Sequence, residues 1–277
     1  VQTCALPISV SDEKMMENYV NEVPERAKKL IKHFWPGPLT IILFVKEGTL
    51  PDAVTGGLPT AAFRCPDDEL THDLISELGK PIVGPSANTS TKPSPTTAGH
   101  VYHDLKGKIA GIIDNGPTEI GLESTIVDLS VETPTVLRPG EITPEEISKV
   151  LGEEVLMNKG TTQTKGVPKA PGMKYRHYAP SAPVFIVDKE EDFSKIKWDK
   201  ETGVAALDEV LDKINSSNKY SLGTTIDKAA HNLFGALRYF DSENNIKRIY
   251  VQGFDHGTIS PAYMNRLNKA AAGHHFH

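Results

Sequence analysis

Residues that could bind an anion are concentrated between Pro81 and His100, in the stretch PIVGPSANTSTKPSPTTAGH. Its first three residues, Pro81 to Val83, are apolar and typical of a buried strand, and the pattern predicts a helix from Thr96. A strand that leads through a hydroxyl-rich loop into a helix can bind an anion. Side-chain hydroxyls, backbone N–H groups and the positive end of the helix can then face one ligand. Ser86 and Ser94 are the candidate ligands, whereas Asn88 could bind the ligand or hold the loop through local hydrogen bonds.

Two arginines and a serine end or open other predicted strands. Arg64 follows three apolar residues in TAAFR, Arg138 precedes Pro-Gly in VLRPG, and Ser124 opens STIVD. An unpaired buried guanidinium is costly, so Arg64 needs an anionic partner, which is either a protein carboxylate or a bound substrate. For Arg138 the alternative is a surface side chain, and for Ser124 it is a hydroxyl at the edge of a strand.

A third cluster lies in the stretch KYRHY, which contains Arg176, His177 and Tyr178. A solvated linker is one interpretation. A linker rarely contains so many rigid aromatic side chains, however, and the prolines on either side would restrain its ends. We therefore expect these three residues to face a ligand.

Composition excludes several classes of protein. The chain has 277 residues, 38% hydrophobic and 24% charged, with a net charge of −6, which is not typical of a basic nucleic-acid surface. Two cysteines cannot form a disulfide framework and are consistent with a reducing, cytoplasmic location. No apolar run has the length of a membrane span, and no P-loop motif or Ser/His/Asp arrangement can be identified.

Histidines do not indicate a metal site in this sequence. His100 and His103 could share a helix face but lack partners at ligand spacing, so we expect them to face solvent. The histidines of the last four residues are predicted to be disordered.

The elements that must position these residues follow from hydrophobic periodicity. In the first part of the chain, helices are expected after Ser11, from Pro24, over 67–78, from Thr96 and from Thr143, and strands over 39–45, 61–64, 109–113, 124–129 and 135–137. The strands are too closely spaced for regular βαβ repetition, so the pattern predicts a twisted mixed sheet with flanking helices.

The second part of the chain has a simpler alternation. Residues 152–170 are polar and rich in Gly, Thr and Lys, as in a linker. Strands are then expected over 184–187, 204–207 and 246–251, with a helix over 225–240. This pattern predicts a small α/β domain of the doubly wound, Rossmann-like kind.

The motifs together resemble one known family. TAAFRCP, SAN, PS, GLESTIVD, VLRPG and PGMKYRHYAP occur in the order seen in the Sua5/YrdC family, the threonylcarbamoyl-AMP synthases that begin the t6A modification of tRNA. The tail after Pro180 resembles the longer, two-domain Sua5 type. The resemblance extends from about residue 8 over nearly the whole chain.

The resemblance implies an activity and a set of site residues. The expected enzyme is a nucleotidyltransferase that makes threonylcarbamoyl-AMP and pyrophosphate from L-threonine, bicarbonate and ATP. Arg64 and Ser124 would bind threonine. The residues implied at ATP are Thr60, Ser86, Asn88, Ser94 and Arg138. Arg176, His177 and Tyr178 would belong to an interdomain lid, and Mg²⁺ would arrive with ATP without a dedicated protein site.

The resemblance also implies domain boundaries. We expect a YrdC-like domain over 9–151, a linker and lid over 152–180 and a Sua5 C-terminal domain over 181–277. Residues 1–8 are interpreted as a non-native leader, since they can be back-translated to a common sequencing adapter, and the family's upstream Lys, Arg and His have no counterpart. Two alternatives stay open: a non-catalytic YrdC-like RNA-binding protein, and an inactive fragment of the synthase.

Overall fold

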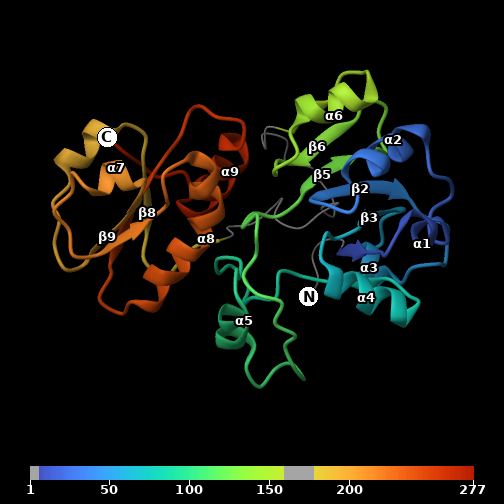
Figure 1. Cartoon of the computed structure of the whole chain (residues 1–277), viewed down its shortest axis with the longest axis horizontal. Helices are drawn as coiled ribbons and strands as arrows, with labels where there is room; N and C mark the ends of the chain where they lie inside the picture. The colour runs from blue at the N-terminus through green and yellow to red at the C-terminus, as the bar shows by residue number, and fades with distance from the viewer. Residues whose placement is uncertain (1–5, 159–177) are drawn as a thin grey trace. The chain divides into compact units, whose positions relative to one another are not determined.

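The computed structural model describes residues 6–158 and 178–277, and the chain folds into two compact units (Figure 1). Unit 1 comprises residues 1–85 and 123–174, and unit 2 comprises residues 86–122 and 175–277. Each unit has its own sheet and its own hydrophobic core. Residues 86–122, which we expected in the first domain, group with the C-terminal part because Asp104 and Leu122 are bonded to or packed with that part.

Unit 1 contains a mixed sheet whose seven described strands have the order β4-β1-β3-β2-β5-β6-β7. The strands are β1 Pro7–Ser9, β2 Leu39–Phe44, β3 Thr60–Arg64, β4 Ile82–Val83, β5 Thr125–Asp128, β6 Thr135–Arg138 and β7 Leu156–Met157. The helices are α1 Glu13–Glu17, α2 Glu25–Phe34, α3 Asp52–Thr55, α4 Glu69–Leu78 and α6 Pro144–Leu151. β2 lies at the centre and is buried up to its last residue, as its apolar sequence predicts.

The two faces of this sheet differ in composition. On one face, Ile41 and Leu43 pack with α2 residues such as Leu30 in the main core. On the other face, a smaller cluster contains Ile42 and Ala62. Alternate residues of β2 therefore serve both faces, as expected for a strand with a side-chain period of two.

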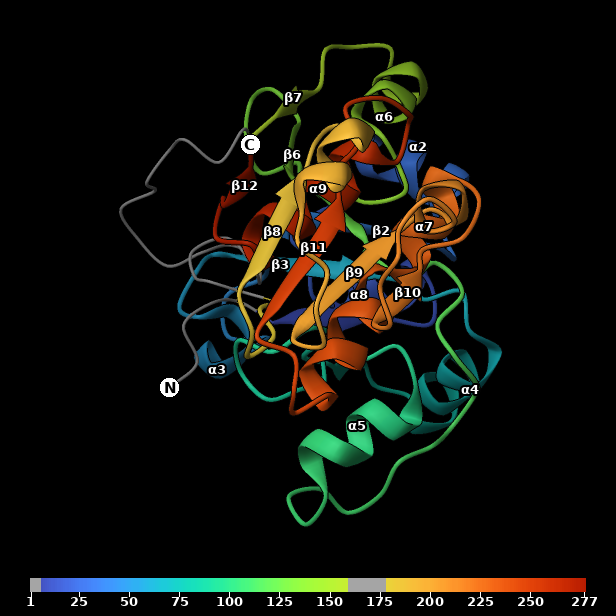
Figure 2. The same ribbon diagram turned by 90° about the vertical axis from the view of Figure 1, so that its left-hand side faces the viewer.

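Unit 2 contains a second sheet, in which β10, β9, β11, β8 and β12 are parallel neighbours in that order (Figure 2). The strands are β8 Val184–Val187, β9 Thr202–Ala206, β10 Lys219–Ser221, β11 Arg248–Gln252 and β12 His275–Phe276. The helices are α5 Ala98–Leu105, the 3₁₀ helix η1 Glu190–Lys195, α7 Asp208–Leu211, α8 Ile226–Ser242 and α9 Ser260–Ala270. Apolar clusters cover both faces of the sheet, one built from α8 and α9 and one from η1 and α7.

Three expectations differ from the structure. Residues 109–113 form no strand, because no described strand pairs with them, and Ile113 is 66% exposed. The strand after Lys80 is not buried, since β4 pairs only with β1 at the sheet edge. The C-terminal histidines are ordered, because β12 pairs with β8 and His275 bonds Asp188 at 2.7 Å. Ile8 lies in β1, where it is buried and pairs with Phe63 and Val83, and the domain boundary predicted after residue 8 stays a prediction.

Candidate functional site

Arg64 is a half-buried cation at the end of β3. Its Nε is buried and has no hydrogen-bond partner among the described residues. Burial lowers the pKa of the guanidinium, yet an arginine keeps its charge because its intrinsic pKa lies above about 12. A charge that is buried and incompletely bonded favours the binding of an anion, and its planar fork fits a carboxylate.

A hydroxyl network lies on strands next to β3. Thr40 and Ser124 share a hydrogen bond of 2.7 Å between their hydroxyls, and both are buried. Arg138 donates from Nη2 to the Ser124 hydroxyl at 3.1 Å and from Nε to the Ser124 carbonyl at 3.0 Å. Strand register explains the meeting: Thr40 pairs with Arg64 on one side and with Ile126 on the other, and Ile126 pairs with Arg138.

Thr60 lies at the opposite end of β3 from Arg64. It is buried and on the same face of the strand, since the two residues are four positions apart. At about 3.3 Å per residue the two Cα atoms are roughly 13 Å apart. One small ligand group therefore cannot contact both side chains.

The loop that contains Ser86, Asn88 and Ser94 belongs to unit 2, and the side chains of Ser86 and Asn88 are bonded within it. Ser86 donates to Asn88 Oδ1, and Asn88 Nδ2 donates to the carbonyls of Lys92 at 2.8 Å and Thr89 at 3.2 Å. Asn88 thus makes the local hydrogen bonds that are expected if it holds the loop in place. Ala87 and Thr91 have φ angles of 53° and 74°, which non-glycine residues rarely adopt. Such strain persists where surrounding contacts fix the backbone, often at ligand sites.

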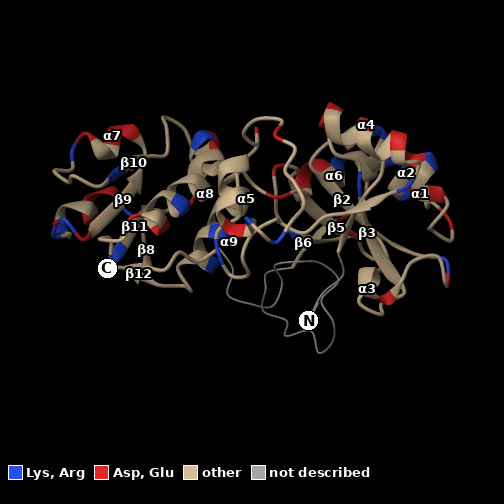
Figure 3. Cartoon of the chain, turned by 90° about the horizontal axis from the view of Figure 1, so that it is seen from below, with Lys and Arg blue, Asp and Glu red and all other residues tan. Residues whose placement is uncertain are grey.

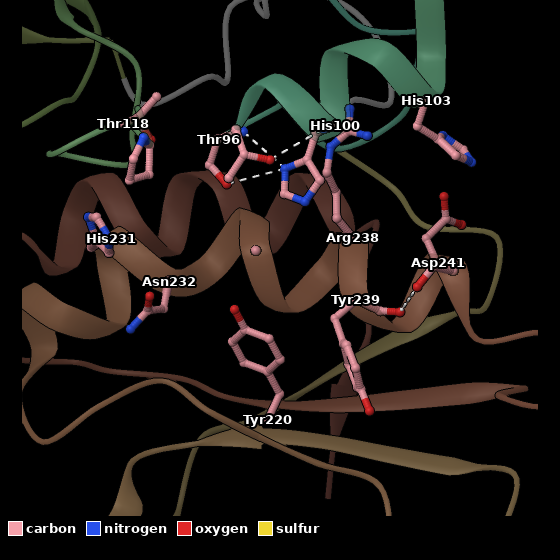
Figure 4. A pocket seen from close by; sticks show the side chains of 14 residues that line it. Thr96, His100, His103, Thr118, Tyr220, His231, Asn232, Arg238, Tyr239 and Asp241 are labelled. Atoms are coloured by element: carbon pink, nitrogen blue, oxygen red, sulfur yellow. Dashed lines mark hydrogen bonds between the residues drawn. The ribbon is translucent and has the colours of Figure 1, made fainter. Parts of the chain in front are cut away.

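Ser94 is buried and is hydrogen-bonded to helix α8. Its carbonyl accepts a hydrogen bond from Arg238 Nε at 3.2 Å. Beside it, a cavity of about 530 Å³ lies between the α5 region and α8, as Figure 4 shows. His100 lines this cavity; it is half-buried, not solvent-facing as we expected, and burial together with Arg238 lowers the pKa of its imidazole.

The lid residues fall partly outside the described chain. Arg176 and His177 lie outside the described residues. Tyr178 is buried in the core of unit 2, where its ring centroid is 5.0 Å from that of Phe234. This packing accounts for the burial of Tyr178, and its predicted contact with a ligand stays a prediction.

Sequence reasoning missed three residues. Thr40 is the one hydroxyl in the apolar run LTIILFV, a signal that could have identified it. Asp104 and Arg238 form a buried ion pair of 2.9 Å, but they are 134 positions apart and no local pattern predicts their meeting.

The described residues provide neither a metal-binding cluster nor a membrane-spanning helix. Within residues 6–158 and 178–277, no group of three or more His, Cys, Asp or Glu side chains is arranged to hold a metal ion. None of the described helices is long and apolar enough to cross a membrane.

The fold and the site define a two-part α/β protein: a mixed sheet contains the half-buried Arg64, and helix α8, which bonds the loop, packs on a parallel sheet. Family models match both parts. The model described as telomere recombination matches residues 2–140, and the C-terminal domain of threonylcarbamoyl-AMP synthase matches residues 142–272.

Individual relatives agree with these matches. The chain is 42% identical to the threonylcarbamoyl-AMP synthase of Bacillus subtilis, over 97% of this chain and 79% of that protein. It is 42% identical to the synthase of Pyrococcus abyssi, over 96% and 79%. The crystal structure of P. abyssi Sua5 complexed with L-threonine matches with a TM-score of 0.89 and 40% identity, covering 99% of this chain and 83% of that chain.

The chain belongs to the threonylcarbamoyl-AMP synthase family, in its two-domain Sua5 form. The predicted fold class is confirmed: a mixed sheet with flanking helices is followed by a small parallel α/β unit.

Proposed function

We propose that this protein is an L-threonylcarbamoyladenylate synthase, which joins L-threonine, bicarbonate and ATP and releases pyrophosphate. The observation that carries the proposal is the buried Nε of Arg64, which has no hydrogen-bond partner in the described part of the chain and whose residue pairs with Thr40 of the Thr40–Ser124–Arg138 network. Similarity to a Sua5 structure that contains L-threonine supports a carboxylate as the missing anion.

Arg64 and Ser124 are the proposed threonine ligands. The guanidinium of Arg64 would bind the carboxylate of the amino acid through parallel hydrogen bonds. The Ser124 hydroxyl is fixed by Thr40 on one side and Arg138 on the other, so it has a defined direction before substrate arrives. A preset hydroxyl loses little conformational freedom on binding.

The proposed ATP ligands are Thr60, Ser86, Asn88, Ser94 and Arg138. Their hydroxyls and the guanidinium suit phosphate oxygens, which carry spread negative charge. ATP is a substrate, and Mg²⁺ would arrive on its phosphates, because this ion keeps several waters and prefers substrate oxygens to an all-protein cage.

The chemistry needs no covalent nucleophile. Bicarbonate takes up a proton and loses water to give CO2, and the threonine amine adds to CO2 and releases a proton to form a carbamate. A carbamate oxygen then displaces pyrophosphate at the α-phosphorus. Positioning and charge neutralisation accelerate such a displacement. A lid formed by Arg176, His177 and Tyr178 would keep water from the labile product. The product would then pass to the enzyme that modifies tRNA, and we propose a cytoplasmic location.

The decisive experiment measures pyrophosphate release from ATP with and without L-threonine and bicarbonate. Release that needs both, and that Arg64→Ala abolishes, supports the synthase. Arg26→Ala is the matched control, because Arg26 pairs with Glu153 on a partly exposed surface. Binding of threonine and ATP without turnover would instead indicate an inactive fragment. Salt-sensitive RNA binding with no response to threonine would favour the RNA-binding alternative. Acidic and basic side chains occur on both units (Figure 3).

A further inference from the structure

Arg238 of helix α8 is a buried cation with four acceptors, all supplied by residues 93–104. Nη2 donates to the Pro93 carbonyl at 2.7 Å and to Asp104 Oδ2 at 2.9 Å. Nη1 donates to Asp104 Oδ1 at 3.2 Å, and Nε donates to the Ser94 carbonyl at 3.2 Å. The side chain is 8% exposed, so these bonds are made away from water. Figure 4 shows Arg238 reaching from α8 toward α5.

Asp104 of helix α5 extends this contact to the start of the loop. Its Oδ2 accepts a hydrogen bond from the Thr89 amide at 2.9 Å. Burial alone would raise the pKa of its carboxyl, but bonds from Arg238, His103 and Thr89 together hold that pKa well below its ordinary value. One carboxylate thus links the amide of residue 89 to the arginine that holds the carbonyls of residues 93 and 94.

A second contact from α8 holds the middle of the loop. Lys92 Nζ donates to both carboxylate oxygens of Asp241, at 2.9 and 2.8 Å, and to the Ser181 hydroxyl at 2.8 Å. The Thr91 carbonyl accepts from the Ala179 amide at 2.9 Å. Partners outside residues 89–94 therefore bond the Thr89 amide, the Lys92 side chain and the carbonyls of Thr91, Pro93 and Ser94, which is consistent with the positive φ angle of Thr91.

We infer that Arg238 and Asp104 are positioning residues. Their contacts fix the conformation of the loop of residues 86–94, which contains the proposed ATP ligands Ser86, Asn88 and Ser94. Arg238 lies in the segment matched by the C-terminal domain model, whereas Asp104 and the loop lie in the segment matched by the first model. The inference rests on the proposed function, because it takes Ser86, Asn88 and Ser94 as ATP ligands. It assigns the C-terminal domain an indirect part in nucleotide binding, because Arg238 of that domain holds the loop through Asp104 and through the carbonyls of Pro93 and Ser94.

The test compares Asp104→Asn, Arg238→Gln and Arg238→Lys with the parent chain in two assays. The first is hydrogen–deuterium exchange of residues 86–94, which needs neither ATP nor turnover. The second is steady-state pyrophosphate release, with separate KM values for ATP and threonine. In Asp104→Asn and Arg238→Gln the loop should exchange faster, and KM for ATP should rise roughly 10- to 100-fold. KM for threonine should stay within about twofold, because no hydrogen bond of the described residues joins Arg64 or Ser124 to Arg238 or Asp104.

Arg238→Lys should give an intermediate KM for ATP, because lysine keeps the charge but loses the planar fork. The matched control is Arg248→Gln, which removes another Arg–Asp pair of unit 2, bonded to Thr202 and Asp199. It should leave both KM values and the loop's exchange unchanged. Unchanged exchange in folded Asp104→Asn and Arg238→Gln would overturn the inference. If these variants exchange faster but the parent chain shows no threonine-dependent release, the proposed function is refuted. The contacts of Arg238 and Asp104 would then stabilise the structure of residues 86–94 without a role in ATP binding. A loss of kcat with unchanged KM for ATP would also overturn the positioning role.

Discussion

Thr40 and Arg64 are direct partners across strands β2 and β3, so their side chains emerge on the same face of the sheet. The Thr40 hydroxyl is bonded to that of Ser124, and the Ser124 hydroxyl is bonded to Arg138. Along the sheet, these two hydroxyls therefore lie between the strand that ends in Arg64 and the strand that ends in Arg138. The register of strands β2, β3, β5 and β6 therefore brings together the described side chains of the candidate threonine site, with Ser124 one residue before β5.

Replacing Arg64 tests the carboxylate ligand. Arg64→Lys keeps a positive charge but loses the bidentate geometry, so KM for threonine should rise roughly 10- to 100-fold, as loss of a charge-assisted hydrogen bond predicts. KM for ATP should change much less. Stability should fall little or even increase, because the buried Nε has no partner to lose. Urea unfolding with steady-state kinetics checks both points; equal changes in the two KM values would contradict the assignment.

Thr40→Val tests the hydroxyl network. Valine has nearly the same shape but cannot bond Ser124, so the variant should lose about 1 kcal/mol of unfolding free energy and bind threonine more weakly. Thr135→Val is the control, because the Thr135 hydroxyl bonds only the nearby Thr133 carbonyl at 2.9 Å among the contacts described. If both variants bind threonine equally well, Thr40 does not direct Ser124 toward the substrate.

Local patterns predicted most of the elements but not their partners. β2, α2, α4, α6 and α8 lie within a few residues of the expected ranges, because each has strong periodicity and a clear end signal. Short edge strands such as β10 and β12 were missed, and residues 109–113 were wrongly predicted as a strand. An apolar run of a few residues becomes a strand only if a neighbour offers backbone partners, which the sequence does not state.

The sequence indicates candidate site residues but not their arrangement, and their roles stay predictions. Among the described residues, the buried Nε of Arg64 has no hydrogen-bond partner and the hydroxyl of Ser124 is buried. The roles of Thr40 and of the Arg238–Asp104 pair could not be predicted, because they depend on long-range contacts. Thr40 bonds a residue 84 positions away, and Arg238 bonds a residue 134 positions away. Their physical signal is burial of polar atoms, which is visible only in the folded chain.

Gly140 is predicted to be essential for the position of Ser124. A Cβ at this residue would lie 2.4 Å from the Thr125 amide nitrogen and 2.8 Å from the Ser124 carbonyl carbon, both in the backbone. Gly140→Ala should therefore move Ser124 or lower stability by about 1–3 kcal/mol, the usual range for overpacking. Gly111→Ala is the matched control, because nothing lies within 4 Å of its added Cβ. Thermal unfolding and threonine binding check the pair, and a fully stable, active Gly140→Ala would contradict the close approach.

Asp104 should make the stability of unit 2 depend on pH below neutrality. Its folded-state pKa is depressed, so its contribution is complete above the unfolded pKa of about 3.9 and is lost as pH falls through the folded value. The charged and titratable groups near it are the buried Arg238, the exposed His103, and His100, whose imidazole interacts with it electrostatically. Asp104→Asn should cost about 3 kcal/mol at pH 7, because it leaves the buried Arg238 without its counter-charge. The difference from the parent chain should shrink as pH falls below about 4, where the unfolded carboxyl takes up a proton. Urea unfolding at several pH values from 7 to 3 measures this difference, and a gap that stays constant down to pH 3 would show that the Asp104 charge contributes nothing to the clamp.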